Sequence, residues 1–165
     1  MLNSLNRELT VCSDIENADR EEAPWNEIRK DIESVVLLDG ISFICNHAFG
    51  GCCNLRSAQI PNSVKSIGER TFARCYYLDK ITIPDSVETI GKSAFAHCNL
   101  ISIKIPASVV SFGGNPFFEC GYLNKINVEE NPNFAFVNGV LMNSKQTQII
   151  YNDPLKFGDY TTQIQ

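Results

Sequence analysis

Short stretches of alternating apolar and polar residues recur along this chain at nearly constant intervals. The clearest spans residues 80–83, where Ile81 and Ile83 alternate with Lys80 and Thr82. This alternation predicts a half-buried strand whose two isoleucines point inward. The same inward pair recurs as Val35 and Leu37, Ala58 and Ile60, Ile103 and Ile105, and Ile126 and Val128. The pattern therefore predicts about five strands, one in each repeat.

A proline closes three of these predicted strands. Pro61, Pro84 and Pro106 follow the second inward residue, where a missing N–H and a fixed φ suit the end of a strand. A second apolar pair predicts the return side of each coil, as Ile41/Ile44, Val64/Ile67, Val87/Ile90 and Val109/Phe112. Gly68, Gly91 and Gly113 come next, and we expect them to occupy a turn that needs positive φ. The first unit has Cys45 at this position.

A short phrase built on phenylalanine and cysteine marks each repeat. The phenylalanines are 23, 23 and 22 residues apart, and a cysteine follows each by three residues: Phe49, Phe72, Phe95 and Phe117, with Cys52, Cys75, Cys98 and Cys120. A period of this length is typical of a solenoid, whose units bury their apolar faces against their neighbours. We expect the phenylalanines and the cysteines to form two internal ladders. Leu100 comes one residue early, which predicts a one-residue deletion after Cys98.

Composition and charge narrow the classes of partner. The 165 residues, 44% of them apolar, suit one folded body, and the net charge of -5 argues against a nucleic-acid partner. The longest aliphatic run, residues 35–38, is far shorter than the roughly 18 residues of a membrane span. The N-terminus lacks the pattern of a signal peptide, and the chain has no N-x-S/T sequence. We expect a protein that stays inside the cell or a segment of a longer protein.

The seven cysteines and two histidines are weighed against chemical roles. Buried, reduced core thiols are favoured for the cysteine column, although a coil spacing of roughly 4.8 Å would permit disulfides between neighbouring coils. Zinc is disfavoured because no C-x₂-C pair is present, and His47 and His97 occupy different repeat positions and do not converge on one cysteine. No phosphate loop or spaced carboxylate pair is evident. The sequence therefore assigns no catalytic, cofactor-binding or metal residue.

The outward positions of the predicted strands form a candidate binding face. Two columns run along it, Ser34/Ser57/Lys80/Ser102/Lys125 and Val36/Gln59/Thr82/Lys104/Asn127. We take as candidate binding residues Ser57, Gln59, Lys80, Thr82, Ser102, Lys104, Lys125 and Asn127. Short polar side chains on a rigid sheet suit protein or glycan binding. The alternative is that these residues are only the polar exterior that any solenoid requires.

The repeat motif, together with the segments that flank it, resembles a known family. The pattern L-x-x-I-x-I-P-x-S-V-x-x-I-G-x-x-A-F-x-x-C, best matched by residues 79–98 and nearly as well by 56–75, is similar to the BspA-like (Treponema pallidum type) leucine-rich repeats. Residues 23–25, 32–36 and 40–44 resemble the segment that precedes the first coil in this family. Residues 133–142 and 148–151 resemble its non-repeat β-hairpin.

This resemblance implies a fold and its organisation. It implies a repeat solenoid, a right-handed coil with a parallel sheet on one face, short helical or turn segments on the other, and a C-terminal β-hairpin insertion. We divide the chain into an N-terminal segment (1–31), a leucine-rich repeat solenoid of about five coils (32–130), and a hairpin island with a truncated end (131–165). Gly113-Gly114 and Asn115-Pro116 depart from the family pattern and predict an irregular fourth unit.

The family also implies a function. Its members act as surface antigens and adhesins, which implies a non-enzymatic binding module at the cell surface or outside the cell, with a host-cell or matrix protein or glycoprotein as partner. The rival hypothesis is a cytoplasmic scaffold for protein–protein contacts, which the missing signal peptide and the many cysteines favour. The chain ends where another coil is expected, so its C-terminal end could also mediate self-association.

Overall fold

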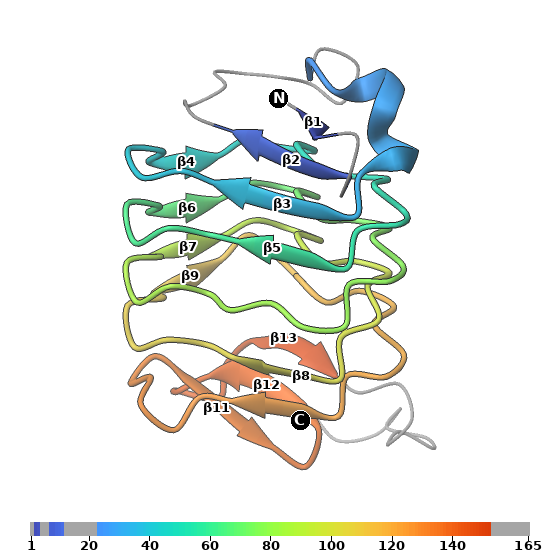
Figure 1. The fold of residues 1–165 in the computed structure, drawn as a ribbon. Coiled ribbons are helices and arrows are strands. Elements are labelled where there is room, and N and C mark those ends of the chain that lie inside the picture. Colours follow the sequence, from blue (N-terminus) through green and yellow to red (C-terminus); the bar gives the residue numbers. More distant parts are fainter. Residues whose placement is uncertain (1, 4–6, 12–22, 153–165) are drawn as a thin grey trace.

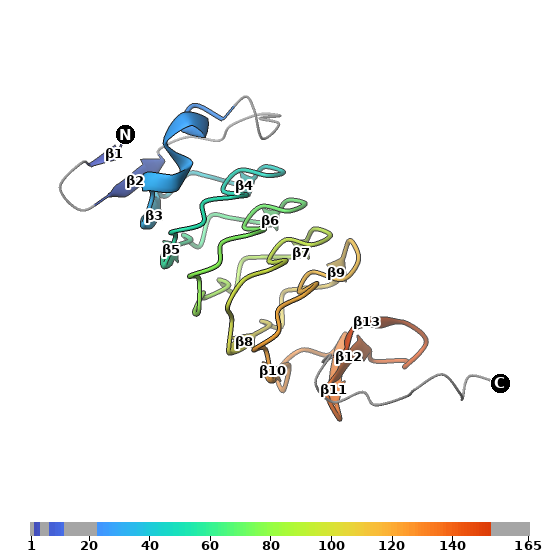
Figure 2. The ribbon, with the colours of Figure 1, turned by 90° about the vertical axis from the view of Figure 1, so that its right-hand side faces the viewer.

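The structure is a β-solenoid of about five turns that stack along one axis (Figure 1). It is a computed structural model, and it describes residues 2–3, 7–11 and 23–152. Each turn of the solenoid passes through two walls, which Figure 2 shows as two rows of strands on opposite sides of the stack. The predicted repeat solenoid is thereby confirmed.

One wall, which we call the front wall, carries the strands with the predicted inward pairs. It begins with β1 (Leu2–Asn3), β2 (Glu8–Val11), β3 (Ser34–Leu37) and β5 (Ser57–Gln59), in that order. Strands β2, β3 and β5 are parallel, and β1 is antiparallel to β2. Farther along, β8 (Ser102–Lys104) pairs in parallel with β10 (Lys125–Asn127). The candidate binding face of the front wall consists of the outward faces of β3, β5, residues 80–83, β8 and β10.

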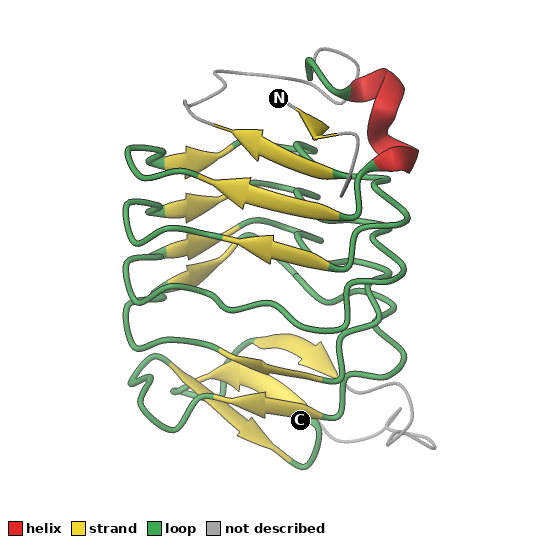
Figure 3. Cartoon of the chain, in the orientation of Figure 1, coloured by secondary structure: helices red, strands yellow, loops and turns green. Residues whose placement is uncertain are grey.

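The opposite wall, which we call the back wall, is a second parallel sheet. It contains β4 (Phe43–Ile44), β6 (Ser66–Ile67), β7 (Thr89–Ile90) and β9 (Ser111–Phe112), paired in this order. Short strands and turns therefore form the return side of the coils. Within the described residues the only helix is a 3₁₀ helix, η1 (Asn26–Asp31), which precedes β3 (Figure 3).

The front wall is interrupted at the repeat whose alternation is clearest. Residues 80–83 lie in the described part of the chain but form no strand, although Ile83 is buried and Ile81 half-buried. The next unit holds the predicted deletion. The N–H of Leu78 donates to the carbonyl of Cys75 (3.0 Å), as in the other full-length loops, whereas that of Asn99 donates to Leu78 of the preceding coil (3.1 Å). The shorter loop is thus anchored differently, and strand pairing is lost beside it.

The repeat glycines are needed for a reason other than the predicted one. Gly68, Gly91 and Gly113 do not take positive φ, so that expectation is wrong. A Cβ on Gly91 would lie 2.5 Å from the backbone nitrogen of Glu69, and one on Gly113 would lie 2.9 Å from that of Lys92. A side chain is excluded because each coil approaches the backbone of the preceding coil at this point.

Positive φ falls instead on residues one or two positions farther along. His47, Arg70 and Ser93 have φ of 59°, 51° and 55°. In the fourth unit Gly114 has a φ of 148°, and the amide oxygen of Asn115 accepts a hydrogen bond from the N–H of Phe117 (2.9 Å). That unit is therefore irregular, although Ser93 and Phe95 still donate their N–H groups to Asn115 and Pro116.

An antiparallel sheet follows the last coil. Strands β11 (Phe134–Val137) and β12 (Val140–Asn143) form the predicted hairpin, and β13 (Ile149–Asn152) adds a third strand. The domain boundaries at 31 and 130 stay a prediction; β2, within the proposed N-terminal segment, pairs directly with β3. The expectation about the final residues, 160–165, lies outside the described residues.

Candidate functional site

The four repeat phenylalanines form a continuous stack inside the solenoid. Neighbouring ring centroids are 5.4, 5.6 and 5.8 Å apart, and the interplanar angles do not exceed 21°. Trp25 stacks on Phe49 at 5.4 Å, and Tyr151 meets Phe117 edge-on at 5.8 Å. Each aromatic pair stabilises by about 0.5–1.5 kcal/mol beyond its burial. All four phenylalanines are buried, so this ladder holds the coils together and is inaccessible to a ligand.

The cysteine column lies beside the phenylalanine stack and binds its backbone. The thiols of Cys75, Cys98 and Cys120 donate to the carbonyls of Phe49, Phe72 and Phe95 in the preceding coils, at 3.3, 3.1 and 3.0 Å. Burial raises the pKa of Cys75 and of Cys98 well above the ordinary range, and raises the pKa of Cys120 to about 12. These thiols stay protonated at neutral pH and are poor nucleophiles.

Disulfides and metal clusters are absent from the described residues. The six cysteines found there are free: Cys45, Cys52, Cys53, Cys75, Cys98 and Cys120. The disulfide alternative for the ladder is thereby removed. Nor do the described residues contain a group of three or more His, Cys, Asp or Glu side chains that could hold a metal ion. His97 contacts Glu119 and Phe118, with its Nδ1 3.2 Å from Glu119 Oε2 and its ring edge-on to that of Phe118.

The N-terminal end of the stack is capped by residues that the sequence reasoning missed. Inside the stack the N–H groups of the first three ladder phenylalanines donate to the next coil, as from Phe49 to Thr71 (2.8 Å). Carbonyls of the first coil therefore need another donor. The indole N–H of Trp25 donates to Ala48 (2.8 Å), and the buried guanidinium of Arg29 donates to Ala48 and Gly50 (both 3.0 Å). The four-residue spacing of Trp25 and Arg29 was the available signal.

A second polar ladder runs along the corner between the two walls. Ser86 and Ser108 donate their hydroxyls to the carbonyls of Val64 and Val87, at 2.7 and 2.6 Å. In the next coil the buried Asn131 takes the serine position, and its amide donates to Val109 (2.9 Å) and Pro106 (2.6 Å). This ladder satisfies buried carbonyls and leaves no group facing a ligand.

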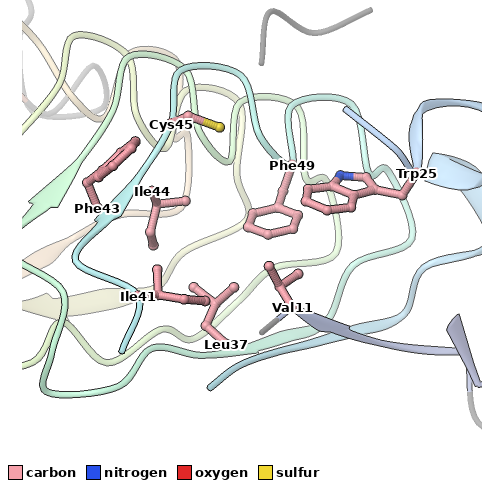
Figure 4. A pocket seen from close by; sticks show the side chains of 8 residues that line it. All are labelled: Val11, Trp25, Leu37, Ile41, Phe43, Ile44, Cys45 and Phe49. Carbon is pink, nitrogen blue, oxygen red and sulfur yellow. The ribbon is translucent and has the colours of Figure 1, made fainter. Parts of the chain in front are cut away.

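A small cavity lies between β2 and the first coil (Figure 4). Its volume is about 20 Å³, and it is lined by Val11, Trp25, Leu37, Ile41, Phe43, Ile44, Cys45 and Phe49. Ligand pockets are far larger, on the order of 300–1,000 Å³. The cavity is a packing gap and not a binding site.

The structure places the candidate binding residues along the front wall. Ser57, Gln59, Lys80, Thr82, Ser102, Lys104 and Lys125 are exposed, and Asn127 is half-buried. Lys125 pairs with Ser102, and Asn127 with Lys104, across β10 and β8. Lys80 and Thr82 lie between β5 and β8, on the coil that forms no strand in the front wall. The wall is therefore continuous in space but interrupted in its strand pairing.

The three lysines of the front wall differ in their surroundings. Lys104 Nζ is 2.7 Å from Glu130 Oε2, and this hydrogen bond raises the pKa of Lys104 and lowers that of Glu130. Within the described part of the chain, Lys80 and Lys125 make no salt bridge. Two of the three lysines are therefore available to a negatively charged group.

The loops that lead into the front wall expose apolar side chains that the sequence reasoning also missed. Tyr76, Tyr77, Ile101 and Tyr122 are 52%, 52%, 49% and 67% exposed. The guanidinium carbon of Arg56 lies 5.0 Å from the centroid of the Tyr77 ring. The signal in the sequence was the Tyr76-Tyr77 pair at a position that is polar in the first unit.

None of the helices in the described residues is long and apolar enough to span a membrane.

Solved structures of leucine-rich repeat proteins share this fold. A leucine-rich repeat protein from Eubacterium ventriosum aligns with a TM-score of 0.72 and 23% identity, over 95% of this chain and 49% of that protein. One from Bacteroides ovatus gives 0.63 and 26%, over 73% and 33%. The T. pallidum leucine-rich repeat protein gives 0.62 and 26%, over 74% and 59%. The chain thus spans from a third to about three-fifths of these proteins.

Comparison with protein families gives a match over most of the chain. Among proteins with a curated function, none matches the sequence. The model of the BspA type leucine rich repeat region matches residues 30–161, in six copies. That span contains every repeat phenylalanine and cysteine, both walls from β3 onward, and the antiparallel sheet. The chain therefore belongs to the BspA type leucine rich repeat family.

Proposed function

We propose that this chain is a non-enzymatic, protein-binding repeat module that recognises its partner through the front wall. Membership in a leucine-rich repeat family supports protein binding, since repeat solenoids offer extended surfaces for this purpose. The front wall itself is the observation on which the proposal rests. It presents short polar side chains and two lysines that form no salt bridge among the described residues, on a backbone braced by the buried ladders, so little conformational entropy is lost on binding.

We further propose that the module acts at the cell surface, as an antigen or adhesin that recognises a host-cell or matrix protein or glycoprotein. Family membership supports this proposal. One observation favours the alternative, a cytoplasmic scaffold: all six described cysteines are free thiols, as expected in a reducing compartment. The two hypotheses share the same binding wall and differ in the partner that reaches it.

Localisation separates these two hypotheses. Intact cells of the source organism are labelled with a membrane-impermeant biotin reagent, and thiols are counted on the purified protein. The surface hypothesis predicts that the chain is labelled on intact cells. Labelling only after lysis, together with seven free thiols, would support the scaffold instead.

Binding by the front wall is tested with a matched pair of variants. Ser102 on β8 and Ser111 on β9 are both exposed, one on each wall. Binding of the purified chain to a panel of matrix and host-cell surface proteins is measured in solid phase. We expect Ser102→Glu to lower the affinity for the bound partner by at least about tenfold and Ser111→Glu to leave this affinity unchanged. Equal losses in the two variants would contradict recognition by the front wall.

A further inference from the structure

Five residues form an exposed strip on the loops that join the phenylalanine–cysteine turns to the front wall. We call this strip the loop edge, and it consists of Arg56, Tyr76, Tyr77, Ile101 and Tyr122. All five are exposed, and the apolar members account for four of the nine exposed large hydrophobic residues in the described part of the chain. Tyrosine and arginine are the residues enriched at the energetic centres of protein interfaces.

The repeat does not require apolar residues at these positions. Tyr76 and Tyr77 stand where the first unit has Cys53 and Asn54, and Ile101 stands where the preceding unit has Asp79. Polar residues at equivalent positions fold into the same coil, so the exposed rings do not serve the core. A group of exposed apolar side chains at equivalent loops, which the fold does not need, points to contact with a partner.

The one-residue deletion separates two of the tyrosines. Tyr77 and Tyr122 occupy the same position of the repeat in coils two apart, and the loop between them has one residue, Asn99, where theirs have two. With neighbouring coils roughly 4.8 Å apart, the two backbones are separated by roughly 10 Å. The intervening loop is held by the hydrogen bond from Asn99 to Leu78 (3.1 Å). Asn99, the one residue of this loop, is half-buried and smaller than tyrosine, so an apolar side chain of a partner can contact the rings on either side of it.

Arg56 holds one of these rings in place before any partner binds. Its guanidinium carbon lies 5.0 Å from the Tyr77 centroid, within the range of a cation–π interaction. A ring fixed in advance loses less rotational freedom on binding. Ile101 occupies the same repeat position as Arg56, and Tyr122 follows it by the same 21 residues by which Tyr77 follows Arg56.

The charges next to the loop edge are positive although the chain as a whole is negative. Lys80 is the first residue of the segment 80–83, and Lys125 is the first residue of β10, so both directly follow these loops. Neither forms a salt bridge among the described residues. Together with Arg56 they lie beside two carboxylates, Asp79 and Glu33, and Glu33 is already paired with Arg7. This local excess of cations complements an acidic partner.

We propose that the loop edge binds an extended, acidic segment of a partner protein. An apolar side chain of that segment lies between Tyr77 and Tyr122, and carboxylates on either side of it face Lys80 and Lys125. The inference rests on the proposed protein-binding function and adds to it the chemistry of the partner. It places the centre of the interface at the edge of the front wall.

A library of short random peptides, displayed on phage and selected on the immobilised full chain, tests this proposal. We expect enrichment of sequences in which aspartate or glutamate flanks an aromatic residue or leucine. The affinity of a selected peptide is then measured by fluorescence anisotropy. Tyr77→Ser and Tyr122→Ser should each weaken it by about tenfold or more, and added salt should also weaken it.

Two exposed apolar residues away from the loop edge supply the controls. Val110, beside β9, and Ile149, on β13, are 58% and 61% exposed, so Val110→Ser and Ile149→Ser make the same chemical change elsewhere. We expect both variants to bind the peptide as the wild type does, with unchanged circular dichroism in all four variants. Equal losses in the controls and in the tyrosine variants would overturn the proposal.

Other outcomes would also overturn it. The selection could yield no enriched sequence, or it could yield basic peptides. The chain could bind glycans on an array and fail to bind acidic peptides. It could also form a concentration-dependent dimer that Tyr122→Ser abolishes. The two proposals fail separately. If Ser102→Glu abolishes binding of a matrix or host-cell protein and the tyrosine variants do not, the front wall is the interface and the loop edge is not. If Ser102→Glu and Ser111→Glu bind equally well and the tyrosine variants do not bind, the front-wall proposal fails and the loop edge stands.

Discussion

The two ends of the solenoid close the same stack in different ways. At the N-terminal end Trp25 lies parallel to Phe49, with an interplanar angle of 10°, while at the C-terminal end Tyr151 meets Phe117 at 88°. The donors differ as well. Trp25 and Arg29 supply N–H groups in place of the backbone of a missing coil, whereas Asn131 extends the serine ladder that the repeats already contain.

The direction of the hydrogen bonds explains this difference. On the phenylalanine side N–H groups point toward the C-terminus, as from Phe72 to Ala94 (2.7 Å), so the carbonyls of Ala48 and Gly50 in the first coil are paired by Trp25 and Arg29 and not by the backbone of another coil. On the back wall the direction is reversed, as from Gly91 to Ile67 (2.8 Å). A buried carbonyl without a donor costs about 1–3 kcal/mol. The N-terminal cap formed by Trp25 and Arg29 is therefore required. At the C-terminal end, Asn131 only extends a ladder that the repeats already contain.

The largest effect is expected in the middle of the stack, away from both ends. Phe95→Ala removes a fully buried ring that contacts a ring on either side, and leaves a cavity. We expect a loss of about 3–5 kcal/mol in the free energy of unfolding, measured in urea. Phe118→Ala serves as the control, since Phe118 follows the ladder residue Phe117 but is 48% exposed, and it should change the free energy of unfolding little. Wild-type stability of Phe95→Ala would show that the stack contributes nothing.

The N-terminal cap gives the next largest effect. Arg29→Met keeps the length and apolar stem of the side chain but removes the donors to Ala48 and Gly50. We expect a loss of about 2–3 kcal/mol, because buried carbonyls lose their partners. The exposed Arg74 provides the comparison, since Arg74→Met should stay within about 0.5 kcal/mol of the wild type. If Arg29→Met lost no more free energy of unfolding than Arg74→Met, the N-terminal end would not require this cap.

At the C-terminal end a smaller change is expected. Asn131→Leu leaves the carbonyls of Val109 and Pro106 without this donor, and should cost about 1–2 kcal/mol. Asn131→Ser restores the residue of the preceding repeats and should cost less. If the serine variant proved the less stable of the two in thermal unfolding, the amide would not be acting as part of the serine ladder.

The buried thiols predict a dependence of stability on alkaline pH. The pKa of Cys120 is raised from 9.0 in the unfolded chain to about 12, chiefly because the thiol is buried. The unfolded state therefore loses its proton first as pH rises, so this stabilising contribution is complete below pH 9 and decreases between pH 9 and 12. Replacing the thiol in Cys120→Ser should make the stability curve flatter over this interval. A curve identical to that of the wild type would contradict a thiol shielded from water.

Much of the fold follows from local pattern. The spacing of Phe49, Phe72 and Phe95 indicates a coil of fixed length, and the missing residue after Cys98 shows where one loop is shorter. In the structure the coils repeat with this period, and the loop at Asn99 is the one that differs. These features depend on residues close together in the sequence, which is why they can be read from it.

Features that depend on a neighbouring coil could not be predicted in the same way. Residues 80–83 have the clearest alternation but form no strand, since strand formation depends on pairing with the neighbouring coils as well as on local pattern. Gly91 is required by its distance to the backbone at Glu69 and not by its own φ. The bond from Arg29 to Gly50 spans 21 residues and has no counterpart in the repeat. In the candidate site, the tyrosines of the loop edge were missed for the same reason.

Oxidative footprinting of the complex with a partner protein from the binding panel tests the central claim most directly. Hydroxyl radicals modify exposed side chains, and mass spectrometry compares the free chain with the bound one. Recognition by the front wall and its edge predicts protection of Tyr77 and Tyr122, with Val110 and Ile149 modified as in the free chain. Protection at Val110 on the side of the back wall, with Tyr77 and Tyr122 still fully reactive, would contradict it.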